Sequence, residues 1–162
     1  MEKKFELTDK FVFNTFGIKL FQIKCTKSFK YAKEGDLGGY VEKDENLDQE
    51  SDAWVSGNAW VSGNAQVSGN AWVYGNARVS GNADIENDNN HCGFDCFGSC
   101  NRHTHAYLTK DNKVEITCGC FRGSIEEFEK KVEGTHSGTI YEKQYKAIIN
   151  VIKIKFGLTD LI

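Results

Sequence analysis

Residues 53–82 read AWVSGN AWVSGN AQVSGN AWVYGN ARVSGN, five consecutive copies of the hexapeptide Ala-x-Val-Ser-Gly-Asn with tyrosine replacing serine once. A weaker sixth copy covers residues 83–88, with Ile85 at the valine position. The same frame extends backward to Leu47 and Val41 at the alanine position. A short repeat of fixed period indicates a fold built from stacked equivalent units. The repeat therefore decides the architecture that we expect for this chain.

Each hexapeptide is predicted to form a short extended segment followed by a turn. Alanine and valine lie two positions apart, so their side chains point to the same side of an extended backbone. Glycine and asparagine tolerate the positive φ angles that a tight turn requires. A period of six is too short for a stack of hairpins, and a Gly-Asn pair in every copy disfavours helix. A triangular coil with one hexapeptide per side, about 18 residues per turn, is the remaining geometry.

This period predicts which residues stack on one another. Trp54 should lie beneath Trp72, Trp60 beneath Arg78, and Gln66 beneath Asp84. The Trp60–Arg78 pair has the composition of a cation–π contact. The residues expected to line the interior are Val55, Val61, Val67, Val73, Val79, Ile85, Ala59, Ala65, Ala71 and Ala77.

Three tryptophans at outward positions are too many to remain in water. Two interpretations stay open: they pack against a neighbouring subunit or the terminal segments, or they form a surface on which a ligand stacks. Arginine beside aromatic rings suits flat ligands that carry phosphate. The candidate ligand-binding residues are Trp54, Trp60, Trp72, Arg78, Arg102 and Arg122.

The repeat resembles the hexapeptide-repeat, left-handed β-helix family, in which an aliphatic residue is followed by a small one, as Val55 is followed by Ala59. Members usually form trimers, so the resemblance implies a homotrimer. The chain also resembles a narrower group found in phages and prophages, through KEGDLGGYVE at residues 33–42 and CGCFRG at residues 118–123. It departs from that group at Cys100, where arginine is expected. Proteins of this group are labelled acyltransferases or carry no assigned activity.

The predicted fold class is mainly β, with a short left-handed parallel β-helix over residues 41–90. A β-rich cap over residues 1–40 should contain strands at 10–13 and 18–25. Residues 91–162 should form a small ββαα domain, with a hairpin of strands 105–110 and 114–120. Ser124 with Glu127 forms a capping box that starts the first helix, which Gly134 should end, and a second helix follows Thr139.

Five of the six cysteines fall between residues 92 and 120. Thiolate and imidazole groups are the usual zinc ligands, although the spacing here is not that of a zinc knuckle. The candidate metal ligands are Cys92, Cys96, Cys100, His103 and Cys120. The alternative is that Cys118 and Cys120 are small apolar residues on one strand face, and that the other cysteines and histidines of this segment lie in a variable loop. We therefore expect no obligatory cofactor, with zinc as the alternative.

Composition narrows the function. The formal net charge of −3 argues against extended nucleic-acid binding. No apolar run is long enough to span a bilayer, and no secretory signal starts the chain, so we expect a cytoplasmic protein. Residues 53–88 contain no histidine to act as the base of an acyltransferase. We predict a non-catalytic, trimeric binding or assembly protein, a phage counter-defence factor that sequesters a nucleotide-type signal or blocks a host defence protein. A hexapeptide-repeat acyltransferase is the alternative.

Overall fold

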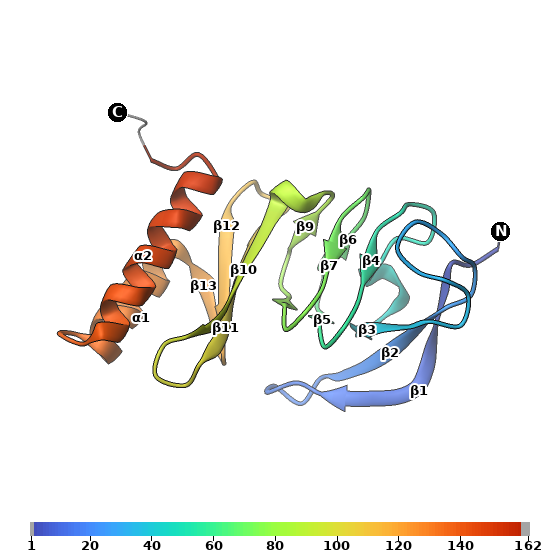
Figure 1. Ribbon diagram of the computed structural model, residues 1–162, viewed down its shortest axis with the longest axis horizontal. Coiled ribbons are helices and arrows are strands. Elements are labelled where there is room, and N and C mark those ends of the chain that lie inside the picture. Colours follow the sequence, from blue (N-terminus) through green and yellow to red (C-terminus); the bar gives the residue numbers. More distant parts are fainter. Residues whose placement is uncertain (1, 160–162) are drawn as a thin grey trace.

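The computed structural model describes residues 2–159, arranged as N-terminal strands, a repeat region, a four-stranded sheet and two helices in series (Figure 1). The predicted fold class, mainly β with a regular left-handed parallel β-helix, is wrong. The fold is mixed, with 37% strand and 22% helix, and over the described residues it has several small separate sheets and no closed or solenoid sheet. The physical reason is that each hexapeptide spends only two residues on strand, because its Ser-Gly-Asn portion forms the turn.

The 18-residue register of the repeat is nevertheless confirmed. Its six two-residue strands are β4 (Trp54–Val55), β5 (Trp60–Val61), β6 (Gln66–Val67), β7 (Trp72–Val73), β8 (Arg78–Val79) and β9 (Asp84–Ile85). The parallel pairs are β4 with β7, β5 with β8, and β6 with β9. All ten predicted interior valine, isoleucine and alanine residues are buried. Gly57 has φ 62°, and a Cβ there would lie 3.3 Å from the backbone of Gly75, so close stacking of turns favours glycine.

The N-terminal segment covers one end of the repeat. Strand β1 (Phe5–Phe13) pairs antiparallel with β2 (Lys19–Cys25), and β3 (Leu37–Val41) pairs in parallel with β5. A short 3₁₀ helix, η1, follows at Asp44–Asn46. The first strand is longer than predicted, because it begins at Phe5, whose buried ring packs edge-on against Trp54.

The C-terminal part contains four strands rather than the predicted two. They are β10 (His91–Phe97), β11 (Arg102–Leu108), β12 (Val114–Cys118) and β13 (Phe121–Ser124), in that spatial order, after the 3₁₀ helix η2 (Asp88–Asn90). Helices α1 (Ile125–His136) and α2 (Ile140–Lys155) follow. The Ser124–Glu127 capping box is confirmed, whereas Gly134 does not end α1, which continues for two residues.

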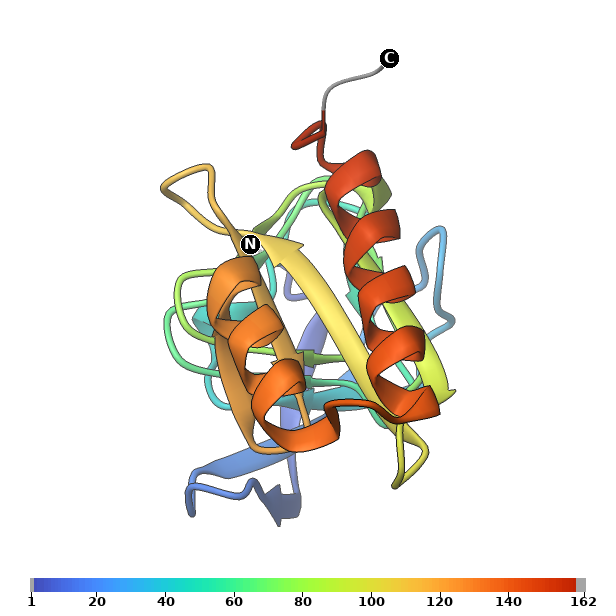
Figure 2. The same ribbon diagram turned by 90° about the vertical axis from the view of Figure 1, so that its left-hand side faces the viewer.

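The C-terminal sheet has two different faces, because strand side chains alternate. Ala106 and Ile116 pack with the helices in one core, and both helices cover this face in Figure 2. Tyr107, on the opposite face of β11, belongs to the core of the repeat. The hydroxyl of Thr117 donates to the carbonyl oxygen of Arg78 at 2.6 Å. The sheet therefore closes the second end of the repeat.

Within residues 2–159, none of the helices combines the length and the apolar character that a membrane span requires.

Candidate functional site

A cleft of about 670 Å³ lies where three parts of the chain meet. The turn between β1 and β2, residues 14–18, forms one wall. The outward face of the repeat at Trp60 and Arg78 forms the second, and the loop ends of the C-terminal sheet form the third. Sequence reasoning placed such clefts between subunits, whereas this one lies within a single chain.

The charge of the cleft is concentrated and positive. The chain contains only three arginines, and all three, Arg78, Arg102 and Arg122, line the cleft. No lysine lines it among the described residues, although lysine is far more abundant in the sequence. Among residues 2–159, Asp95 is the single carboxylate of the lining. A protein with a net charge of −3 therefore presents its guanidinium groups together in one hollow.

Arg78 is held rigidly. Its guanidinium carbon lies 3.8 Å from the centre of the Trp60 ring, so the predicted cation–π contact is confirmed. Its Nη1 donates to the carbonyl oxygens of Asn58, Asn76 and Ala77 at 2.8, 3.1 and 3.2 Å. Burial lowers the pKa of this guanidinium from its ordinary value, yet arginine remains charged at neutral pH. The result is a fixed cation that carries further N–H donors.

The other two arginines are more exposed. Arg122 Nε lies 3.6 Å from Glu115 Oε1, and of the three arginines it alone pairs with a carboxylate within residues 2–159. Arg102 lies over Gly119, where an added Cβ would clash with its Nη1. Two of the three cations thus keep their charge uncompensated by a carboxylate, which favours an anion in the cleft.

Aromatic surface accompanies these cations. Trp60 and Phe121 are half-buried in the lining, and Phe16 at the turn of the N-terminal hairpin is 73% exposed. Rings of this kind offer flat apolar faces for stacking. The cleft therefore combines the two features, guanidinium groups and aromatic faces, that suit a flat anionic molecule.

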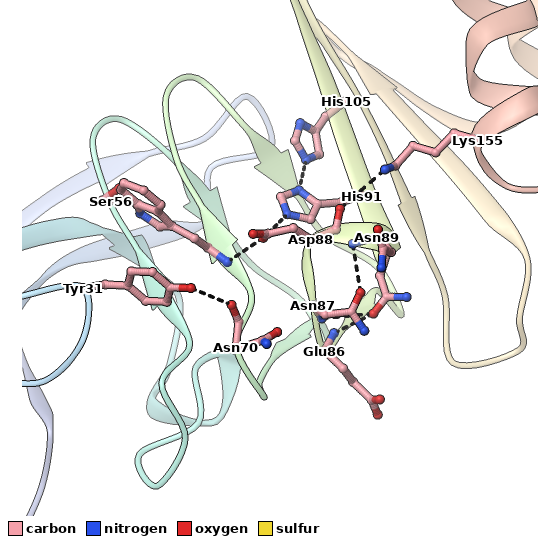
Figure 3. Close-up of polar contacts among 12 residues, drawn as sticks. Tyr31, Ser56, Asn70, Glu86, Asn87, Asp88, Asn89, His91, His105 and Lys155 are labelled. Carbon is pink, nitrogen blue, oxygen red and sulfur yellow. Dashed lines mark hydrogen bonds and ion pairs between the residues drawn. The ribbon is translucent and has the colours of Figure 1, made fainter.

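A row of three histidines runs from the cleft into the interior. Asp95 Oδ1 lies 2.6 Å from His103 Nδ1, and His103 Nε2 lies 2.9 Å from His105 Nδ1. His105 Nε2 lies 2.9 Å from His91 Nδ1, and His91 Nε2 lies 3.4 Å from Asp88 Oδ1. We call these five residues the histidine chain. Figure 3 shows the end of the histidine chain away from the cleft, where the buried rings of His105 and His91 lead to the exposed side chain of Asp88.

The histidine chain lies between the C-terminal sheet and the repeat. Strand alternation puts His103 and His105 on the same face of β11 as Tyr107. Burial lowers the pKa of His105 well below its usual value, and the neighbouring His91 and His103 add to this effect. Burial also lowers the pKa of His91, while Asp88 opposes the shift. These rings are therefore held neutral near pH 7.

Two predicted ligand-binding tryptophans lie outside the cleft. Trp54 is 2% exposed beneath Phe5 and Phe29, so for this residue the packing interpretation, against the terminal segment, is correct. Trp72 is 38% exposed and stacks on Tyr31 at a ring distance of 5.3 Å. The repeat places equivalent side chains on different faces, and only Trp60 faces the cleft.

The predicted metal ligands are divided in the same way. Cys96, His103 and Cys120 line the cleft, whereas Cys100 is exposed elsewhere. Cys92 packs against the helical core, where burial raises the pKa of its thiol and disfavours the thiolate that zinc requires. Among residues 2–159 no group of three or more histidine, cysteine or acidic side chains could hold a metal ion. The five predicted ligands do not form a ligand set.

Sequence reasoning missed Asp95, Phe16, Phe121 and the connection among the histidines. The signal for the histidines was the spacing of two between His103 and His105, which on a strand puts both on one face. The residues of the N-terminal turn carried no such signal, because their role depends on how the hairpin folds over the repeat.

The chain was also compared with known proteins. No family model matches it, and no curated protein matches it. The resemblance to phage-type hexapeptide-repeat proteins stays a prediction.

Proposed function

We propose that this protein is a non-catalytic binding protein whose cleft holds a small nucleotide-type ligand, with a flat aromatic part and a phosphate group. The observation that carries this proposal is the gathering of all three arginines in one cleft that no lysine lines among the described residues. Guanidinium groups match phosphate oxygens in planar, two-pronged hydrogen bonds, which an ammonium group cannot make. A volume of about 670 Å³ is within the range of small-molecule sites.

The rigid Trp60–Arg78 pair supports recognition rather than general attraction. Arg78 is already fixed by three carbonyl oxygens, so little side-chain freedom is lost when it binds an anion. Trp60 and Phe121 offer stacking faces within the same cleft. A ligand that carries both a phosphate and an aromatic ring would use both features at once.

The geometry gives less support to acyl transfer. A base must present a free nitrogen to the proton that it removes. His103 is the histidine that lines the cleft, and both of its ring nitrogens are engaged, one by Asp95 and the other by His105. Acyltransferase activity would require this pair of contacts to open.

The homotrimer and the cytoplasmic location belong to the same proposal. All six cysteines are free thiols, which suits a reducing compartment. A role in sequestering a nucleotide-type signal of a host defence follows from the resemblance to phage proteins. In that role the cleft would lower the free concentration of the signal without converting it.

Calorimetry against mono-, di- and cyclic nucleotides, with adenosine and sulfate as partial ligands, tests the proposal. Arg78→Ala should weaken nucleotide binding by about ten- to a hundredfold, because one charge-assisted hydrogen-bonding group is lost. The matched control is Lys143→Ala, which removes an exposed cation from α2. Trp60→Leu should weaken nucleotides but not sulfate, and Trp72→Leu should change neither. Equal effects in the Arg78 and Lys143 variants, or steady turnover of acetyl-coenzyme A, would contradict the proposal.

A further inference from the structure

The proton content of the histidine chain can be counted from its contacts. Four nitrogen–oxygen or nitrogen–nitrogen pairs join Asp95, His103, His105, His91 and Asp88 in line. Each pair needs one proton to be a hydrogen bond. Two ionised carboxylates supply none, and each neutral imidazole supplies one. Three neutral histidines therefore supply protons for three of the four pairs. The histidine chain as a whole lacks the proton for one hydrogen bond.

The distances indicate which pair lacks it. The shortest contact, 2.6 Å between Asp95 and His103, fits an N–H that donates to a carboxylate. If His103 donates to Asp95, then His105 must donate to His103 and His91 must donate to His105. His91 Nε2 is then left with a lone pair that faces Asp88. This is the longest contact, at 3.4 Å.

The same geometry explains why the histidine chain is neither a metal-binding site nor a general base with a free ring nitrogen. Every ring uses both of its nitrogens within the row, so no two rings direct lone pairs at a common point. What the arrangement offers is a place for one added proton. That proton would complete the fourth hydrogen bond, and its charge could move along the row through the existing contacts.

We propose that the histidine chain is a proton-binding site that takes up one proton when an anion binds in the cleft. The linkage rests on the proposed function, because it needs an anion beside Asp95 and His103. The proton comes from solvent and forms an N–H bond at His91 Nε2. Transfer from His91 to His105 and then to His103 carries the positive charge toward the cleft, with no other atom gained or lost.

The surrounding charges set the direction of this linkage. Asp88 stabilises a proton on His91 at the end away from the cleft. Lys155 of α2, whose Nζ lies 3.5 Å from the Asp88 carbonyl oxygen, opposes this proton. Thr117, opposite His105 on β12, is neutral. At the cleft end, Asp95 favours the proton. The groups that face this end from the other elements are Arg78, Arg102 and Arg122, with the thiols of Cys96 and Cys120.

In the free protein, burial lowers the pKa of His91 and of His105, so these two rings are neutral near pH 7. A bound anion compensates the arginine charges and attracts a positive charge at His103. Because the buried imidazole rings repel one another when more than one is charged, the histidine chain accepts one proton and not two. Anion affinity should therefore rise as the pH falls from about 8 to about 6, by at most about tenfold per pH unit for one linked proton.

Calorimetry with sulfate, which does not titrate in this range, measures the linkage directly. Titrations in two buffers of different ionisation enthalpy should show uptake of up to one proton per sulfate bound. Asp88 Oδ1 also accepts from the backbone N–H of Trp72 at 3.0 Å, so an asparagine oxygen would keep this bond while the negative charge that faces His91 is lost. Asp88→Asn should therefore weaken the proton uptake. The control Glu86→Gln removes one exposed carboxylate nearby and should leave the uptake unchanged. Sulfate binding without proton uptake in the wild type would overturn the linkage.

Imidazole ¹⁵N spectra of the free protein distinguish the two proposals. His91, His103 and His105 should share one protonation step as the pH falls, because the three rings are hydrogen-bonded to one another. Three independent titrations would overturn the proton-binding site even if sulfate binds. A shared step in a protein that binds neither sulfate nor nucleotides would instead overturn the proposed function and leave the proton-binding site standing.

Discussion

The repeat region and the C-terminal sheet both have buried cores, but they are built by different rules. In the repeat, the same small set of side chains recurs, and its interior valines and alanines are at most 1% exposed. In the sheet, one face carries aliphatic residues toward the helices, and the other carries histidines toward the repeat. Regular stacking makes a stable platform whose outward positions are nearly equivalent. The difference teaches that a distinct site arises where the non-periodic part meets the platform.

The largest expected effect tests the repeat core. Val67→Asp puts a charge without a partner among fully buried side chains, and the cost should exceed the total stability of the fold. We expect loss of soluble expression. The neighbouring residue on β6 offers the control, because Gln66 is exposed and Gln66→Asp adds the same carboxylate on the outward face. A folded Val67→Asp protein, seen by circular dichroism, would refute the interior assignment.

A smaller effect is expected in the helical core. Ile152→Ala removes a side chain that is 0% exposed and should lower the free energy of unfolding by about 2–5 kcal/mol. Val151→Ala, at a position 49% exposed on the same helix, should change it by well under about 1 kcal/mol. Urea unfolding followed by tryptophan fluorescence measures both. Because all three tryptophans lie in the repeat, a shifted fluorescence midpoint would show that the two cores unfold together, and an unshifted one would show that they do not.

The smallest effect concerns pH. Because the folded-state pKa values of His91 and His105 are lowered, the unfolded chain binds more protons than the folded one below about pH 6.5. Stability should therefore be full above that pH and decline below it, by up to about 1.4 kcal/mol per pH unit for each group. Urea unfolding in a series of buffers from pH 7.5 to pH 5.5 would show this slope. A free energy of unfolding that increases on acidification over this range would contradict the burial of His91 and His105 in their neutral forms.

The sequence was most informative where local rules decide the structure. The stacking of Trp60 with Arg78 followed from the period alone, and the interior valines followed from alternation. The start of α1 followed from a capping box formed within four residues. In each case the interacting groups are related by a short or repeated spacing, so the geometry is encoded locally.

The same reasoning failed where partners are distant in sequence. The sequence does not predict strand β10 and favours a variable, cysteine-bearing loop there, because the pairing with β11 is needed to define this segment as a strand. The continuous β-helix was overestimated, because a clear repeat indicates stacking but does not say how little of each unit forms sheet. Trp54 and Trp72 were grouped with Trp60, although the N-terminal segment buries the first and stacks on the second.

The sequence by itself determined the register of the repeat, its apolar interior and the scarcity of arginine. Only the tertiary structure decided that Arg78, Arg102 and Arg122 meet in one cleft, and that three histidines from β10 and β11 form a row between two aspartates. The physical reason is that spacing in a periodic segment fixes side-chain direction locally. The approach of a hairpin, a coil face and a sheet edge depends instead on how separate cores pack, which no local pattern records.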